Sequence, residues 1–267
     1  EYTSFLTTAM VKEIIKSGIL PKGSLQIIPG LGRGILDHVD HRDVVTFTGS
    51  AATGKILKSH PNILAHSVPF NMEADSLNAC VLGKDAVPGT AEFDLFVKEV
   101  HKEMTVKTGQ KCTAVRRVLV PENTIDLVQE ALISRLGKTA IGNPDNKEVR
   151  MGALATKIQV ERVKENVELL MKSQEKVYGS LEKIPLIDAQ FEKGCFFSPI
   201  LFRNEQPFLK DDVHHVEAFG PVSTLIPYKD MEEAVAIVEM GKGSLVTSIV
   251  TNDDEMANNT PEINEIA

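Results

Sequence analysis

The sequence predicts an α/β protein built on a parallel sheet. Short apolar segments of strand length alternate with longer segments in which apolar residues recur at helical spacing. The chain has 267 residues, of which 42% are hydrophobic and 25% charged, the composition of a globular protein with a sizeable buried core. Because strands and helices alternate, we expect a parallel sheet covered by helices, in one large or two medium domains.

The first predicted unit covers residues 1–73. A helix is expected at 5–15, where the apolar residues follow helical spacing. Strands are expected at 25–28 and 44–47, and a helix at 51–59. Because the chain opens on a helix without a preceding strand or cap, we expect that it starts inside a larger fold.

The second predicted unit covers residues 74–257. Its expected elements are a strand at 79–82, a helix at 92–106, a strand at 117–120, a helix at 123–136, a helix after 156, and strands at 197–202, 223–226 and 244–251. Thr156-Lys-Ile-Gln159 is a capping box, and the helix that it opens is expected to face inward with Ile158, Val163, Val167 and Leu170. The polar tail, 258–267, is expected to fray.

Composition and charge limit the partners. A formal net charge of −8 argues against broad binding of nucleic acid, because neutralising phosphates needs clustered Lys and Arg. No apolar run reaches the ~20 residues of a membrane helix, and the first residues lack the regions of a secretory signal. Cys80, in an apolar strand, and Cys195, before two phenylalanines, are expected to be packing residues. No Cys or His pairs recur at zinc-ligand spacing, so we expect a cytoplasmic protein without a metal.

Cys112 is the candidate nucleophile. It follows the polar residues 108–111 and precedes an apolar strand, so its sulfur is expected to be exposed. The neighbouring cations Lys111, Arg116 and Arg117 are expected to favour the thiolate, which is the nucleophilic form of cysteine. The alternative is a small buried residue at a junction between loop and strand.

Phe47-Thr-Gly-Ser50 lies where a predicted strand leads into a predicted helix. Such a turn offers backbone N–H groups and the positive end of the helix dipole, which together bind phosphate without a basic side chain. The alternative is a simple turn in which Ser50 is the helix N-cap. No Gly-x-Gly-x-x-Gly motif follows a predicted strand.

Glu73 and Glu217 are candidate functional carboxylates. Glu73 follows the apolar segment Val68-Pro-Phe70, and a carboxylate in apolar surroundings has a raised pKa and can act as a general base. Glu217 begins Glu-Ala-Phe-Gly-Pro, in which the carboxylate can accept hydrogen bonds from a ribose and Phe219 can pack on a flat ring. The alternatives are a salt-bridged residue at a strand end and a plain turn.

This ordered set of motifs resembles the aldehyde dehydrogenase superfamily. The superfamily carries a Phe-Thr-Gly-Ser phosphate turn, a Glu base, a Gly-Gln-x-Cys nucleophile and a Glu-x-Phe-Gly-Pro motif at about these separations, and the likeness runs from residue 1 to about residue 256. The local sequence at 47–54, 72–78 and 108–114 is similar to the PaaZ-type subgroup of phenylacetate degradation. That subgroup also carries a MaoC-type hydratase domain, and nothing like that domain is found in this sequence.

The resemblance implies the C-terminal part of a Rossmann-like cofactor domain, residues 1–73, followed by an α/β catalytic domain, residues 74–257. It makes Cys112 the nucleophile and Glu73 the base that activates a hydrolytic water. It also places further residues on the cofactor, NADP or NAD: Thr48, Gly49 and Ser50 along the phosphates, Glu217 on the nicotinamide ribose and Phe219 against the nicotinamide. The superfamily's usual Glu-Leu-Gly-Gly reads Glu73-Ala-Asp-Ser76 here, a departure that can alter how the nicotinamide is held.

The implied reaction oxidises an aldehyde to a carboxylic acid through a thioester on Cys112. In the subgroup the substrate is a CoA-linked semialdehyde, 3-oxo-5,6-dehydrosuberyl-CoA semialdehyde, and the full-length protein is expected to be a homo-oligomer. The family's oxyanion-binding Asn and a cofactor-binding Lys would precede residue 1, and its oligomerisation strand would follow the tail. We therefore expect the chain by itself to be a poorly active fragment.

Three alternatives stay open. A CoA-acylating reductase of the same fold would pass the thioester to CoA, although that class usually replaces the hydrolytic Glu and Glu73 is present here. A cysteine-dependent hydrolase would need a His base, and no His lies near Cys112 in the sequence. The chain can also be an inactive structural or interaction unit.

Overall fold

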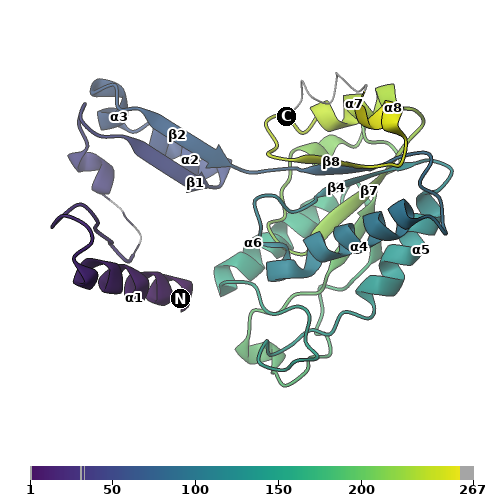
Figure 1. The fold of residues 1–267 in the computed structure, drawn as a ribbon, viewed down its shortest axis with the longest axis horizontal. Coiled ribbons are helices and arrows are strands. Elements are labelled where there is room, and N and C mark those ends of the chain that lie inside the picture. The colour runs from purple at the N-terminus through teal and green to yellow at the C-terminus, as the bar shows by residue number, and fades with distance from the viewer. Residues whose placement is uncertain (1, 31, 33, 259–267) are drawn as a thin grey trace. The chain divides into compact units, whose positions relative to one another are not determined.

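The computed structural model describes residues 2–30, 32 and 34–258 (Figure 1). The chain divides into two compact units, Glu1–Asp75 and Ser76–Ala267, each with a sheet of its own. The division falls two residues after the predicted one at 73. The predicted tail, 258–267, lies outside the described residues except for Asn258, which ends a short helix.

The first unit holds a two-stranded parallel sheet and short helices. In chain order its elements are α1 (Tyr2–Ser17), the 3-10 helix η1 (Ile35–His38), β1 (Val45–Gly49), α2 (Ala51–Lys58), α3 (Pro61–Ala65) and β2 (Phe70–Ala74). The helices predicted at 5–15 and 51–59 and the strand predicted at 44–47 are confirmed.

The strand predicted at 25–28 is wrong. These residues belong to no strand, because a strand needs a hydrogen-bonded neighbour and none of the described strands pairs with them. Leu25 and Ile27 are half-buried, while Ile28 is exposed. Apolar composition indicated a buried strand, but it does not show whether a partner strand exists.

The two faces of the small sheet differ. Helix α2 covers one face so closely that a Cβ on Gly54 would lie 2.3 Å from the sulfur of Met72 and 3.2 Å from the ring of Phe47. Because side chains alternate along a strand, Thr48 and Glu73 point to the other face, and both are exposed. In this unit the candidate base therefore lies on the open face.

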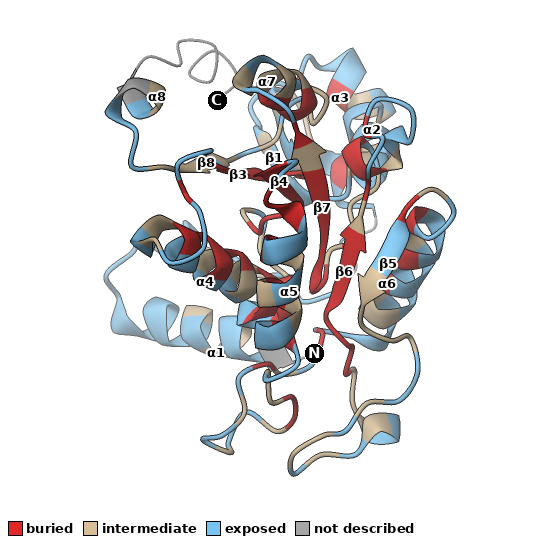
Figure 2. Ribbon diagram, turned by 90° about the vertical axis from the view of Figure 1, so that its right-hand side faces the viewer, coloured by how far each residue is buried: buried red, intermediate tan, exposed pale blue. Residues whose placement is uncertain are grey.

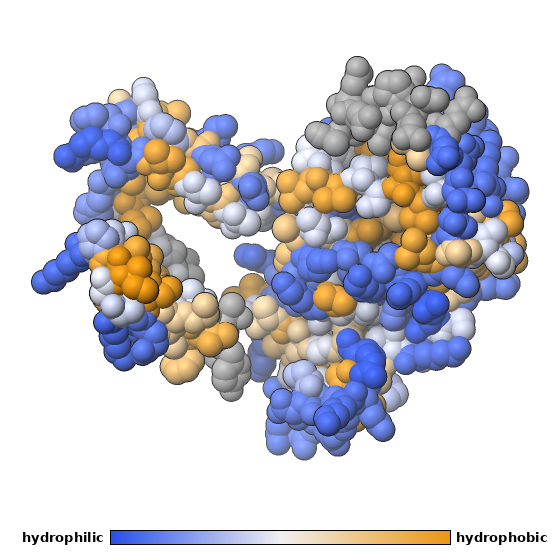
Figure 3. Space-filling view, viewed as in Figure 1, coloured by the Kyte–Doolittle hydropathy of each residue, from blue (hydrophilic) through white to orange (hydrophobic). Residues whose placement is uncertain are grey.

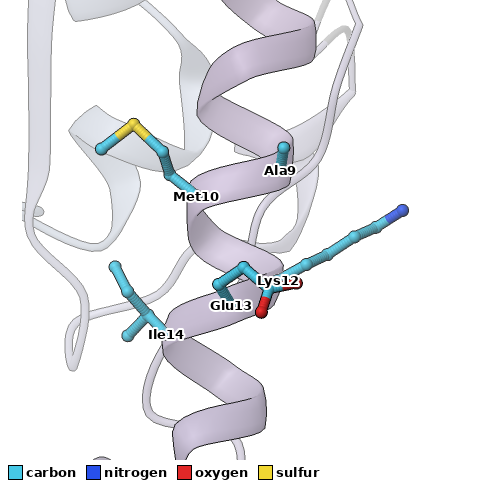
Figure 4. Close-up of a pocket in the computed structure, with 5 residues that line it drawn as sticks. All are labelled: Ala9, Met10, Lys12, Glu13 and Ile14. Atoms are coloured by element: carbon cyan, nitrogen blue, oxygen red, sulfur yellow. The ribbon is translucent and has the colours of Figure 1, made fainter.

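Helix α1 carries its apolar stripe on an exposed surface. Phe5, Leu6 and Met10 are all more than half exposed. Met10 and Ile14 project from one side of the helix, and Lys12 projects from the other (Figure 4). Hydrophobic residues, orange and tan in Figure 3, are visible at the surface of this unit. The periodicity that predicted this helix thus marks an apolar face that is not buried among the described residues.

The second unit is built on a six-stranded sheet in the order β5-β6-β7-β4-β3-β8. Neighbouring strands are parallel except for β5 and β6, which pair antiparallel. The elements are β3 (Ala79–Leu82), α4 (Ala91–Thr105), η2 (Val106–Gly109), β4 (Arg117–Pro121), α5 (Ile125–Leu136), α6 (Lys157–Leu170), β5 (Glu175–Tyr178), η3 (Phe191–Lys193), β6 (Ile200–Arg203), η4 (Asp211–His214), β7 (Val222–Tyr228), α7 (Met231–Glu239), β8 (Thr247–Val250) and α8 (Asp254–Asn258).

The centre of this sheet is buried on both faces (Figure 2). On one face α4 and α5 pack against β3 and β4, in a cluster that includes Phe96, Val118 and Leu132. On the other face α7 packs against β3, β4 and β7, in a cluster that includes Leu119 and Ile237. Burial on both sides explains why β3 and β4 are apolar throughout apart from Arg117, and why the sequence predicted both strands correctly.

β5 and α7 are among the elements of the second unit that had no prediction, and one predicted core residue is wrong. β5 is a partly exposed edge strand with charged residues, so it lacks the apolar run of a buried strand. α7 carried a usable signal, because Asp230 caps it by accepting a hydrogen bond from the N–H of Glu233. Ile158 was predicted to face inward but is 61% exposed, since it lies in the first turn of α6, whereas Val163 and Val167 are buried as predicted.

Arg117 lies at the start of β4 and is 0% exposed. Its side chain connects β4 to the segment before β3 and to the end of α7. Its Nε donates to the Leu77 carbonyl at 2.6 Å. Its Nη atoms donate to the carbonyls of Ile237 and Val238, at 2.6 and 3.0 Å, at the C-terminal end of α7. A buried guanidinium is tolerated there because the last carbonyls of a helix lack partners and carry its negative dipole end.

Among the described residues no helix is long and apolar enough to cross a membrane.

We predict that Gly241→Ala lowers the free energy of unfolding by about 1–3 kcal/mol. A Cβ at this position would lie 2.0 Å from Nη2 of Arg117, whose guanidinium is fixed by its carbonyl partners. Urea unfolding followed by circular dichroism measures the change. The matched control is Gly243→Ala, because nothing lies within 4 Å of a Cβ there. Equal losses in the two variants would show that the guanidinium is free to move.

We also predict a loss of stability in mild acid that depends on His214. Burial, and then the charge of Arg117, lower the pKa of His214 from 6.5 to about 4, and its Nδ1 accepts a hydrogen bond from Arg117 at 3.1 Å. Between these two pH values the unfolded chain binds the additional proton, so the free energy of unfolding falls as the pH falls, by up to about 3 kcal/mol.

Unfolding measured at several pH values between 7 and 4 tests this prediction. His214→Gln should flatten the dependence relative to the unaltered chain, because the titrating ring is gone. The control His215→Gln removes the exposed neighbour and should keep the original slope. An unchanged slope in His214→Gln would contradict the prediction.

Candidate active site

The loop before Cys112 has an unusual backbone. Three consecutive residues of η2 have positive φ: Lys107 at 52°, Thr108 at 56° and Gly109 at 67°. Two of these residues carry a Cβ, and that conformation costs them free energy. The hydroxyl of Thr108 donates to the carbonyls of Gly152 and Ala153, each at 3.2 Å, and so anchors the loop to another segment.

Gly109 lies in contact with the backbone of Gly220. A Cβ on Gly109 would sit 2.1 Å from the Gly220 carbonyl oxygen and 2.8 Å from Cα of Pro221. The next residue, Gln110, donates to the Lys107 carbonyl at 2.9 Å and accepts from the N–H of Ala155 at 2.9 Å. The Gly-Gln pair thus has a physical role, since glycine permits the close approach and glutamine ties the loop in place.

Cys112 is exposed, as predicted. The alternative of a small buried residue fits Cys80 instead, where burial raises the pKa of the thiol to about 12. The backbone of Cys112 is held by the buried side chain of Asn78, whose Nδ2 donates to the carbonyls of Cys112 at 2.8 Å and Ala114 at 3.0 Å. Asn78 was not among the predicted site residues, although a single amide side chain directly before the apolar strand β3 could have indicated a role in the site.

Asn78 is itself fixed by the residues around it. Its Oδ1 accepts from the hydroxyl of Ser76 at 2.6 Å and from the N–H of Val246 at 2.9 Å. Its backbone carbonyl accepts from the N–H groups of Arg116 and Arg117, both at 3.0 Å. One buried residue therefore joins the beginnings of β3 and β4 to the Cys112 peptide.

The three cations expected beside the thiol are directed elsewhere, which corrects that expectation. Lys111 forms an ion pair with Glu103, at 2.6 and 2.8 Å from its two oxygens. Arg117 binds the end of α7. Arg116 donates to carbonyls of Gly109 and Gly220 and pairs with Glu217. Proximity in sequence did not show that each cation has another partner.

Glu217 and Phe219 lie beside this loop in the folded unit. The Glu217 side chain is 8% exposed, and its carboxylate accepts from Arg116 Nε at 3.4 Å and from the N–H of Ser76 at 3.1 Å. The Phe219 ring is half-buried, with the Arg116 guanidinium 5.6 Å from its centroid. The plain-turn alternative for this segment does not account for a buried, paired carboxylate.

The Phe219 carbonyl also explains an error in the predicted capping box. Thr156 caps α6 by accepting from the N–H of Gln159 at 3.1 Å, as expected. The side chain of Gln159 does not return to Thr156, because it donates to the carbonyl of Phe219 at 2.8 Å. The first turn of α6 thus holds the segment that carries Glu217 and Phe219.

The first unit brings together Thr48, Gly49, Ser50 and Glu73. Ser50 is the N-cap of α2 and accepts from the N–H of Thr53 at 3.3 Å, so the simple-turn alternative describes its side chain. A Cβ on Gly49 would lie 2.6 Å from the Phe47 ring, so a side chain at this position would have to displace that ring. The exposed turn leads into the N-terminus of α2, and its assignment to a phosphate stays a prediction.

Glu73 pairs in register with Thr48, and its surroundings correct the sequence analysis. Its side chain was expected in apolar surroundings, but Glu73 is exposed on the face opposite α2. The apolar residues before it, Val68 and Phe70, pack in a cluster with Leu36 instead, because strand alternation turns Glu73 the other way.

Among the described residues no group of three or more His, Cys, Asp or Glu is arranged to hold a metal.

Known proteins resemble this chain over almost its whole length. It is 44% identical, over 251 residues, to a 3,4-dehydroadipyl-CoA semialdehyde dehydrogenase of Aromatoleum evansii, covering 94% of this chain and 49% of that protein. It is 30% identical to a 1-pyrroline-5-carboxylate dehydrogenase of Staphylococcus epidermidis, covering 94% of this chain and 47% of that protein. The chain therefore spans about half the length of the curated relatives that it matches.

Solved structures agree with these sequence matches. A betaine aldehyde dehydrogenase variant of Staphylococcus aureus in its apo form superposes with a TM-score of 0.82 at 26% identity, covering 98% of this chain and 50% of that one. Another variant, solved in complex with NAD+, gives a TM-score of 0.83 at 25% identity, covering 97% and 51%. The family model described as the aldehyde dehydrogenase family matches residues 1–264. From these matches, and from the site built around Cys112, we conclude that the chain belongs to the aldehyde dehydrogenase family.

Proposed function

We propose that the protein containing this chain oxidises an aldehyde to a carboxylic acid through a thioester on Cys112, with NAD or NADP as oxidant. The observation that carries the proposal is the exposed Cys112, whose peptide is fixed by buried Asn78 and whose loop contacts the segment with Glu217 and Phe219. An exposed thiol, on a loop that contacts the segment with a half-buried ring and a carboxylate, supports chemistry between a covalent substrate and a flat cofactor.

In the first steps, the Cys112 thiolate adds to the aldehyde carbon and forms a thiohemiacetal alkoxide, and loss of hydride from that carbon leaves a neutral acyl thioester. A bound nicotinamide supplies the acceptor for the hydride. Glu73 removes a proton from water as the water oxygen attacks the thioester, and the carbon–sulfur bond then breaks to release the acid and restore the Cys112 thiolate. The N–H of Cys112 is the backbone donor that we assign to the substrate oxygen.

The described residues fit a dinucleotide on separate grounds in each unit. In the first, Thr48, Gly49 and Ser50 lead into the N-terminus of α2, where backbone N–H groups and the dipole suit a phosphate. In the second, Phe219 offers a half-buried ring for the nicotinamide. Glu217 is the proposed acceptor for a ribose hydroxyl. That hydroxyl would donate to the same carboxylate that accepts hydrogen bonds from the Ser76 N–H and from Arg116 Nε.

The substrate class that we propose is an aldehyde carried on a CoA thioester, in the breakdown of aromatic compounds. The support is the name of the A. evansii relative, a 3,4-dehydroadipyl-CoA semialdehyde dehydrogenase, at 44% identity. The suberyl compound expected from the sequence belongs to the same class, and the proposal is limited to what the two share. Homo-oligomeric assembly and a cytoplasmic location are part of the proposal as well.

A chimera tests the proposal. In it this chain replaces the matched half of the A. evansii enzyme, and the product is given CoA-linked semialdehydes or a simple aldehyde, with NAD+ or NADP+. We expect reduced nucleotide and free acid in equal amounts, and neither product from the Cys112→Ser variant. An inactive chimera beside an active parent enzyme would contradict the proposal. Acyl-CoA formed in place of acid when CoA is added would favour the CoA-acylating alternative.

We predict that limited iodoacetamide labels Cys112 ahead of Cys80 and Cys195 near neutral pH. Cys112 is exposed, Cys195 is half-buried, and the raised pKa of Cys80 keeps that thiol protonated. Peptide mapping of the 267-residue chain measures the order of labelling. In Cys112→Ser the same dose should leave the other two cysteines almost unlabelled. Preferential labelling of either of them would refute the assignment.

We predict that Glu73→Gln in the chimera keeps hydride transfer but slows release of the acid. Glutamine cannot take a proton from water, so the acyl thioester on Cys112 should accumulate. Rapid mixing should show a burst of reduced nucleotide followed by a slow steady state, and intact mass should show the acyl adduct.

Glu13→Gln is the matched control for Glu73→Gln. Glu13 is an exposed carboxylate of the same unit, on α1, where it pairs with Lys16 at 2.7 Å. Its variant should keep the rate and the time course of the unaltered chimera. If Glu73→Gln loses burst and steady state equally, the division of roles proposed for Cys112 and Glu73 is wrong.

A further inference from the structure

Two consecutive arginines at the start of β4 are buried, and they serve different parts of the second unit. Arg116 is 4% exposed and Arg117 is 0% exposed. Neighbouring residues in an extended segment point to opposite sides, so the two guanidinium groups reach different partners. Arg117 binds the carbonyls of Leu77, Ile237 and Val238, and none of these residues belongs to the candidate site.

The partners of Arg116 all belong to the candidate site. Its Nη2 donates to the carbonyl of Gly109, in the loop before Cys112, at 2.8 Å. On the other side its Nη1 donates to the carbonyl of Gly220 at 2.6 Å, and its Nε pairs with Glu217 at 3.4 Å. The same guanidinium lies 5.6 Å from the centre of the Phe219 ring. One side chain therefore bridges Gly109 and Gly220, and Gly220 lies 104 residues after Arg116 in the sequence.

The chemistry of these contacts requires arginine. Burial lowers the pKa of Arg116 and the charge of Glu217 opposes that effect, so the two groups depend on each other for burial. A planar guanidinium can reach two carbonyls and a carboxylate in different directions at once. The ammonium group of lysine is a compact point charge and cannot span both carbonyls.

We propose that Arg116 is a positioning residue, which clamps the Cys112 loop to the Glu217–Pro221 segment through the Gly109 carbonyl on one side and the Gly220 carbonyl and Glu217 carboxylate on the other. The functional part of this inference rests on the proposed dehydrogenase activity, because it concerns the nucleophile and the residues assigned to the nicotinamide. The clamp fixes the separation of the two segments, and misplacing reacting groups by about 1 Å can cost about 100-fold in rate.

Hydrogen exchange of the 267-residue chain tests the clamp without any activity. In Arg116→Lys, backbone amides of residues 106–113 and 216–220 should both exchange at least about tenfold faster, because both segments lose their shared partner. The matched control is Arg117→Lys, also buried and one residue on. In Arg117→Lys the faster exchange should instead appear at residues 237–241, where carbonyls at the end of α7 lose their donor. Arg116→Lys with unchanged exchange, or the same pattern in both variants, would overturn the clamp.

A double variant keeps the test decisive where a single change unfolds the chain. Arg116→Met leaves the buried Glu217 carboxylate without its cation, which can prevent folding. Arg116→Met combined with Glu217→Gln removes that stranded charge and should melt at a higher temperature than Arg116→Met alone. Both segments should still exchange fast in the double variant, because neither glycine carbonyl regains a donor. Slow exchange there would contradict the clamp.

Kinetics of the chimera test positioning separately. Arg116→Lys should lower kcat by about 10- to 100-fold while KM for the aldehyde changes by less than about threefold. Arg117→Lys, assayed well below its melting temperature, should keep kcat within about twofold of the unaltered chimera. Faster exchange with an unchanged kcat would overturn the positioning role. An inactive unaltered chimera would count against the proposed function, and the exchange data would still decide the clamp.

Discussion

Contact between the backbones of Gly109 and Gly220 constrains the whole candidate site of the second unit. No Cβ fits between them, since one on Gly109 would lie 2.1 Å from the Gly220 oxygen. To bring Gly109 there, Lys107 and Thr108 take positive φ angles that L-residues rarely adopt. The contact is held because each glycine carbonyl accepts a hydrogen bond from buried Arg116. Two motifs that lie far apart in the sequence thus form one structure.

Much of the fold could be predicted from the sequence wherever local patterns decide it. β3 and β4 are central strands buried on both faces, so their apolar runs are unambiguous. Thr156 begins α6 because its hydroxyl replaces a missing backbone partner, which is also a local effect. The failures depend on distant residues. Residues 25–28 have the composition of a strand without a strand to pair with, and Gln159 completes no capping box because Phe219 offers another acceptor.

The candidate site was predictable in residue type but not in environment. The polar loop indicated correctly that Cys112 is exposed. Glu73 was expected in apolar surroundings but is exposed, whereas the Glu217 side chain, for which the sequence predicted no environment, is buried against Arg116. Strand alternation explains the first, and a pairing across 101 residues explains the second. The first unit by itself therefore does not surround Glu73 with apolar side chains.

The nucleophile is held through its peptide, which leaves its sulfur available for chemistry. Asn78 binds the carbonyl of Cys112, and its own carbonyl receives the N–H groups of Arg116 and Arg117. These bonds join the Cys112 loop to the pairing of β3 with β4 at the centre of the sheet. A loop supported from a buried sheet keeps its position more firmly than a free surface loop, because moving it would break hydrogen bonds that have no water to replace them. An exposed, unpaired thiol and a fixed peptide are thus compatible, since different atoms of one residue meet the two requirements.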